Sequence, residues 1–192
     1  MVAITSILAA STAVFGLVAA APSSWHVPST GVIHRITAGS TVENNGLHFE
    51  PQNVVAEVGD WIEFHFLAKN HTVVQSSFEK PCEPLAGGNG IFSGFNFATP
   101  PGAGENKNVF TFQIKDKNTI WYYCSQTAGD HCQSGMTAVI NQNFNNNDKT
   151  LAKHKELAKN TKTVQPSANI LESKGGNILP NSFCAQGIRC AN

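Results

Sequence analysis

The sequence lacks three features that would have pointed to other classes of protein. No stretch of useful length before residue 148 repeats its apolar residues at the helical period. No second long apolar run follows the first twenty residues. The chain also has no excess charge, since it holds 13 Lys and Arg against 13 Asp and Glu. These absences argue against a mainly helical domain and against a nucleic-acid partner.

The one long apolar run lies at the N-terminus. Residues 2–20 carry no charge and end in small residues, which is typical of the apolar core and cleavage site of a secretory signal, although the usual positive stretch is missing. The alternative is a membrane anchor, but the run is only marginally long enough to span a bilayer. We predict a signal peptide over residues 1–20 and an arm over residues 21–33. The mature protein is then secreted, extracellular or cell-wall associated, and makes no membrane contact.

The region from residue 34 to residue 141 consists of short strand patterns separated by turn signals. Ile62, Phe64 and Phe66 alternate with more polar residues, and a second alternation follows in residues 110–114. Residues 119–124 are rich in β-branched and aromatic side chains, and residues 136–140 form a last strand pattern. The region therefore predicts an all-β sandwich.

The remaining residues, 142–192, have a different composition. They hold seven basic and three acidic residues, whereas residues 21–141 hold six basic and ten acidic ones. A run of Asn and Gln opens the segment, and residues 149–162 can form one short, charged helix. We expect a polar, partly disordered basic tail. It is a solvated appendage or, alternatively, makes weak contact with acidic wall polymers or with the domain itself.

One short segment contains a thiol, an imidazole and a thioether, all of which can bind a transition metal. Cys124, His131 and Met136 lie within thirteen residues, and a second imidazole, His71, lies far upstream. Two His, one Cys and a weak axial Met form the ligand set of a mononuclear blue-copper site, whose chemistry is one-electron transfer. The alternative, an inert buried thiol at Cys124, leaves the positions of the other three residues unexplained.

The cysteine count fits this ligand set. An odd number of cysteines, five, leaves one thiol over in a secreted protein. With Cys124 as a ligand, four cysteines remain, and three pairings are open to them. The short separation of Cys184 and Cys190 favours a small loop closed by those two. Cys82 would then pair with Cys132.

The ligand segment resembles the cupredoxins, in particular the phytocyanin branch and the related secreted, plastocyanin-like proteins of fungi. In phytocyanins a disulfide Cys directly follows the second ligand His, and a Met or Gln lies five residues beyond that His. The spacing here is the same in His131, Cys132 and Met136. The resemblance covers residues 34–141 and implies a Greek-key β-sandwich, one copper ion and a bond between Cys82 and Cys132.

The same resemblance assigns further roles and shows one departure. It implies that the Asn70–His71 pair places a ligand, and we expect the Asn70 side chain to hydrogen-bond across the ligand loops. His34, His48 and His65 are expected at surface or strand positions rather than as ligands. The departure is the length of the ligand loop. Six residues separate Cys124 from His131, where the family usually has four.

These features predict a secreted one-electron carrier rather than an enzyme. We expect a monomer with an unidentified redox partner. One alternative is extracellular copper sequestration or delivery without electron transfer, and another is a metal-free wall or interaction protein that keeps the fold. A multicopper oxidase is disfavoured because the chain has a single domain and no His-x-His pair.

Overall fold

The computed structural model describes residues 31–40, 44–182 and 190–191. The expected signal peptide, most of the N-terminal arm and Cys184 lie outside these residues. The described elements, in chain order, are β1 (Ile33–Ala38), η1 (Asn44–Gly46), β2 (Phe49–Glu50), β3 (Asn53–Val54), β4 (Trp61–Phe66), β5 (Val74–Ser76), β6 (Glu105–Asn106), β7 (Asn108–Gln113), β8 (Ile120–Tyr123), β9 (Thr137–Ile140), α1 (Leu151–Ala158), β10 (Asn177–Pro180) and β11 (Cys190–Ala191).

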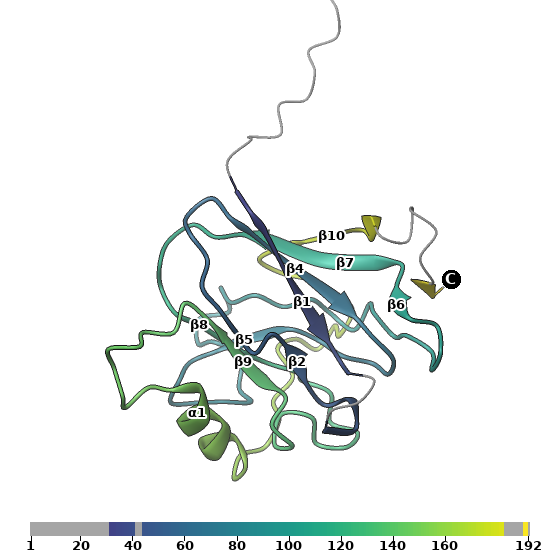
Figure 1. Cartoon of the computed structure of the whole chain (residues 1–192). Helices are drawn as coiled ribbons and strands as arrows, with labels where there is room; N and C mark the ends of the chain where they lie inside the picture. Colours follow the sequence, from purple (N-terminus) through teal and green to yellow (C-terminus); the bar gives the residue numbers. More distant parts are fainter. Residues whose placement is uncertain (1–30, 41–43, 183–189, 192) are drawn as a thin grey trace, which may run out of the picture.

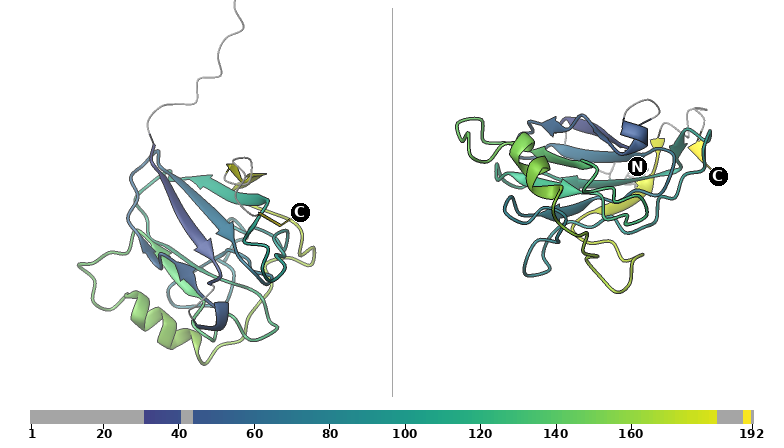
Figure 2. Two further views of the ribbon diagram at one scale, coloured as in Figure 1. Left: turned by 45° about the vertical axis from the view of Figure 1, so that its right-hand side comes forward. Right: turned by 90° about the horizontal axis from the view of Figure 1, so that it is seen from below.

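Two sheets pack face to face (Figure 1). One has the strand order β10-β7-β4-β1-β2 and the other the order β3-β9-β8-β5, while β11 pairs with β6. The pairs β1 with β4 and β3 with β9 are parallel, and the other pairs within these two sheets are antiparallel. Figure 2 shows the same layers from two further directions, with α1 at the periphery. The predicted all-β sandwich is confirmed.

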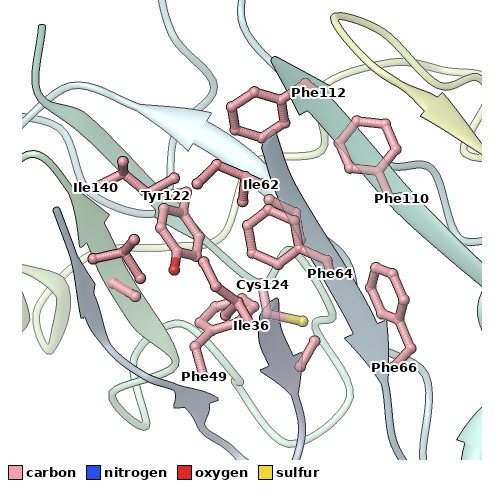
Figure 3. Packing of buried hydrophobic residues seen from close by; sticks show 14 of the residues in the cluster. Ile36, Phe49, Ile62, Phe64, Phe66, Phe110, Phe112, Tyr122, Cys124 and Ile140 are labelled. Atoms are coloured by element: carbon pink, nitrogen blue, oxygen red, sulfur yellow. The ribbon is translucent and has the colours of Figure 1, made fainter. Parts of the chain in front are cut away.

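The core lies between the sheets and follows from the period-two pattern of the strands. In β4 the alternating residues Ile62, Phe64 and Phe66 are fully buried. Phe64 meets Tyr122 of the opposite sheet edge-on, with 5.3 Å between the ring centroids. Cys124 belongs to the same buried cluster, and Figure 3 shows its side chain among these residues.

His65, in the same strand, is also fully buried, but it is no part of this apolar cluster. Its two ring nitrogens lie 2.7 Å and 2.9 Å from carboxylate oxygens of Glu63 and Glu105. The carboxylates therefore partner both ring nitrogens, in keeping with its expected strand position.

The segment after residue 141, expected to be a polar and partly disordered tail, contains a helix and a strand that contact the sandwich. A short helix was expected within residues 149–162, and α1 lies there. It begins after Thr150, whose side chain accepts a hydrogen bond from the Lys153 amide. Its buried residue His154 stacks on Trp121 with 4.8 Å between the rings. Strand β10 pairs with β7 and completes the edge of the larger sheet. These contacts with distant strands argue against a fully solvated appendage for these elements. The expected partial disorder of the tail stays a prediction. The domain boundary after residue 141 stays a prediction.

Helix α1 has only eight residues. Within the described ranges, no helix has the length and apolar character needed to cross a membrane.

Candidate metal centre

The four predicted ligands come from loops at the ends of strands. His71 lies between β4 and β5, Cys124 directly follows β8, and Met136 directly precedes β9. Because β8 and β9 are antiparallel neighbours, the end of one lies beside the start of the other. The Cys124 amide donates to the Met136 carbonyl over 3.1 Å, and the Met136 amide donates to the His131 carbonyl over 3.0 Å. The sandwich thus holds Cys124, His131 and Met136 at one end.

Three ligand atoms converge. The Cys124 Sγ lies 3.3 Å from His131 Nδ1 and 3.9 Å from His71 Nδ1. All three side chains are buried, and the two imidazole rings lie 4.9 Å apart. A tetrahedral metal with bonds of about 2.0 Å to nitrogen and 2.3 Å to sulfur places such atoms about 3.5 Å apart. The separations therefore fit one metal ion held between the three.

The orientation of the His71 ring leaves Nδ1, the nitrogen that faces Cys124, free to bind a metal ion. Its Nε2 lies 3.1 Å from the Ala68 carbonyl, which can only accept, so Nε2 carries the proton and Nδ1 keeps its lone pair. Behind the ring lies Gly39, at a φ of 107°, where an added Cβ would come within 3.0 Å of Nε2. Glycine at this position gives the imidazole its space.

Two fungal proteins have sequences similar to this chain. No protein-family model matches the chain. The "Probable GPI-anchored cupredoxin-1" of the fungus Arthroderma benhamiae is 28% identical, over 82% of this chain and 80% of that protein. The chain is a cupredoxin-fold protein.

A second relative of the cupredoxin chain is the "Extracellular serine-rich protein" of the same fungus. It is 35% identical over 152 residues, which are 79% of this chain, and the chain spans about half of that relative's length, 55%. Among solved structures, a native pseudoazurin from Hyphomicrobium denitrificans aligns over 68% of this chain and 100% of its own, with 21% identity and a TM-score of 0.39.

A threonine that was not among the predicted site residues joins the two segments that hold the predicted ligands. The Thr72 amide donates to Cys124 Sγ over 3.3 Å. Its hydroxyl oxygen accepts from the Ser125 amide over 2.8 Å and lies 2.9 Å from Ser125 Oγ. Thr72 directly follows His71, and that adjacency was the only sequence signal for its role.

Asn70 differs from its expected role. The expectation was a side-chain hydrogen bond across the ligand loops, but it is the main-chain carbonyl of Asn70 that accepts from Gln126 Nε2, over 3.4 Å. The buried side-chain oxygen of Asn70 has no hydrogen-bond partner among the described residues. The bridge between the loops is therefore made by Thr72, whose short side chain reaches Ser125.

Burial sets the protonation of the site. Burial raises the pKa of the Cys124 thiol to about 11, against the opposing effect of amide hydrogen bonds from Gln126 and Thr72. Burial, followed by the charge of His131, lowers the pKa of His71 to about 4. Burial, followed by the charge of Lys69, lowers the pKa of His131 to about 4. Without metal, the neutral forms are favoured at pH 7, so a bound cation would displace one proton, that of the thiol.

A disulfide braces the same end of the cupredoxin domain. Cys82 and Cys132 are bonded, with 5.8 Å between their Cα atoms and a sequence separation of 50. Cys124 is a free, buried cysteine, and Met136 is fully buried in the same apolar cluster. The pairing of Cys184 with Cys190 stays a prediction, because Cys184 lies outside the described residues.

Proposed function

We propose that this cupredoxin domain binds one copper ion through His71, Cys124, His131 and Met136 and carries single electrons. The observation that supports this most strongly is the buried His71–Cys124–His131 cluster. Two imidazoles, a thiolate and a thioether match the donors of blue-copper sites rather than those of hard cations. Copper bound there would supply a change between Cu(I) and Cu(II).

The surrounding residues suit such a role. The Ala68 carbonyl fixes the tautomer of His71, and the Thr72 amide donates to the Cys124 sulfur, a contact that tunes the redox potential of copper–thiolate sites. The ligand side chains are almost completely shielded from water, with exposed fractions of 0% for His71 and Cys124 and 3% for His131. With four protein ligands, the proposed site keeps no open coordination position for a substrate, so we propose a carrier rather than an enzyme.

The setting we propose is outside the cell or at its surface. It rests on the apolar segment 2–20 and on the names of the two fungal relatives, one described as extracellular and one as GPI-anchored. The redox partner is a second protein that accepts or donates one electron, and the domain acts as a monomer.

Elemental analysis, visible absorption and voltammetry of the purified protein test the proposal. We expect one copper per chain, a copper–thiolate absorption band and a reversible couple. Cys124→Ser removes the thiolate and should abolish the band. A wild-type protein that holds copper without a reversible couple would refute electron transfer and favour copper sequestration or delivery. A wild-type protein that takes up no copper would refute both.

A further inference from the structure

The segment that follows α1, residues 159–165, crosses the disulfide at the metal end of the domain. We refer to these residues as the strap. The Val164 amide donates to the Cys82 carbonyl over 2.9 Å. The Val164 carbonyl accepts from the Tyr123 hydroxyl over 2.8 Å. The strap is thereby attached to the residue before Cys124 and to one half of the disulfide.

The strap also holds both ends of the ligand loop. At the first end, Gln165 Nε2 donates to the Ser125 carbonyl over 2.7 Å. At the second end, Gln133 Nε2 donates to the Thr161 carbonyl over 3.3 Å, and the Thr163 hydroxyl donates to Gln133 Oε1 over 3.0 Å. Between these two points lie the exposed residues 127–130 and the ligand His131.

Ser125, next to Cys124, is consequently fixed from two sides. Its amide donates to Thr72, which adjoins His71, and its carbonyl accepts from Gln165 of the strap. The Cys124 side chain starts one residue away, so a displacement of Ser125 would move the thiol. A residue whose amide and carbonyl are both hydrogen-bonded has both of its flanking peptide groups held in place.

We infer that the strap is part of the metal centre and that Gln165 is a positioning residue for Cys124. It acts through the Ser125 carbonyl and keeps the ligand loop closed, with or without metal. Its effect on a bound ion rests on the proposed copper function, whereas its effect on the buried thiol does not. The inference gives a function to a segment whose polar composition alone indicates a solvated tail.

The metal-free protein provides the first test. Wild-type protein, Gln165→Ala and Gln113→Ala are treated with a thiol reagent, and modification of the Cys124 peptide is followed by mass spectrometry. Gln113→Ala is the matched control, because Gln113 Nε2 donates to a backbone carbonyl, that of Gly59, over 3.0 Å in a segment that holds no ligand. Urea unfolding of all three proteins reports their global stability.

We expect Gln165→Ala to raise the modification rate of Cys124 about three- to tenfold, the factor that one hydrogen bond is worth. Gln113→Ala should leave the rate at the wild-type value. Gln165→Glu, which keeps the shape but replaces the donor with an acceptor, should behave as Gln165→Ala. Equal rates in all variants would overturn the inference. So would a rise that Gln113→Ala shares, because the cause would then be global stability.

The copper-loaded protein provides a readout that mere packing would not move. We expect Gln165→Ala to shift the copper–thiolate absorption maximum and the reduction potential, and Gln113→Ala to leave both unchanged. Wild-type spectra in Gln165→Ala would overturn the positioning role. If no variant takes up copper, the proposed function fails, and the thiol-protection experiment still decides the role of the strap.

Discussion

Replacing Thr72 with valine tests how the two ligand-bearing segments are held together. Thr72 is fully buried, and its hydroxyl oxygen accepts from the Ser125 amide over 2.8 Å and contacts Ser125 Oγ at 2.9 Å. Valine keeps the shape and removes these contacts, together with the 3.9 Å contact between the hydroxyl and Cys124 Sγ. A buried amide left without a partner costs about 1–3 kcal/mol, and one neutral hydrogen bond contributes about 1 kcal/mol. We expect the free energy of unfolding to fall by about 2–3 kcal/mol.

For a chain of this size, that loss corresponds to a fall in Tm of about 4–12 °C. Urea unfolding of the metal-free wild type, Thr72→Val and Thr72→Ser measures it, and the serine variant, which keeps the oxygen, should recover most of the stability. Thr111→Val is the control, since the buried Thr111 hydroxyl donates to the Ile62 carbonyl within the larger sheet over 2.8 Å. It should lose stability with an unchanged copper spectrum, whereas Thr72→Val should change both. A Thr72→Val protein within 0.5 kcal/mol of wild type would refute the reasoning, because that lies below the roughly 1–3 kcal/mol cost of an orphaned amide.

Two further predictions concern protonation and potential. Burial lowers the pKa of His154 to about 4, against about 6.5 in an unfolded chain, so between these values the unfolded state binds a proton that the folded state excludes, and stability falls as pH falls. His154→Phe should therefore lose less stability between pH 7 and pH 5 than wild type in urea unfolding, and an equal loss in both would contradict this. Met136→Gln should lower the reduction potential, because a harder oxygen ligand favours Cu(II); voltammetry checks this, and an unchanged potential would argue against Met136 as the axial ligand.

The strands could be predicted from the sequence because a strand that is buried on one face has an apolar residue at every second position. Ile62, Phe64 and Phe66 carry that signal, and all three are buried in the structure. The ligand loop could be predicted because thiol, imidazole and thioether are the donors of blue-copper sites, and because their spacing resembles that of the phytocyanins. Both patterns involve residues that are close together in the sequence, so they can be recognised without knowledge of the fold.

The role of the tail could not be predicted because it depends on partners far away in sequence. Nothing in the sequence around Gln165 shows that its amide reaches Ser125, forty residues earlier. Strand β10 has only four residues and is a strand because the edge of β7 offers it hydrogen bonds. Thr72 was missed for a similar reason, since its two contacts lie across the site, at Cys124 and Ser125.

The ligand loop is two residues longer than the family usually has, and its residues 127–130 are exposed. The His131 amide donates to the Gln126 carbonyl over 3.2 Å, and the Asp130 amide donates to the Thr127 carbonyl over 3.1 Å, so the loop closes on itself as an exposed turn. Shortening a flexible loop from six residues to four changes its closure free energy by only about 0.4 kcal/mol. Deleting Thr127 and Ala128 should therefore leave stability and metal stoichiometry nearly unchanged. Elemental analysis and urea unfolding check this, and a deletion variant that loses its metal or more than about 2 kcal/mol, several times that closure term, would show that the turn itself positions His131.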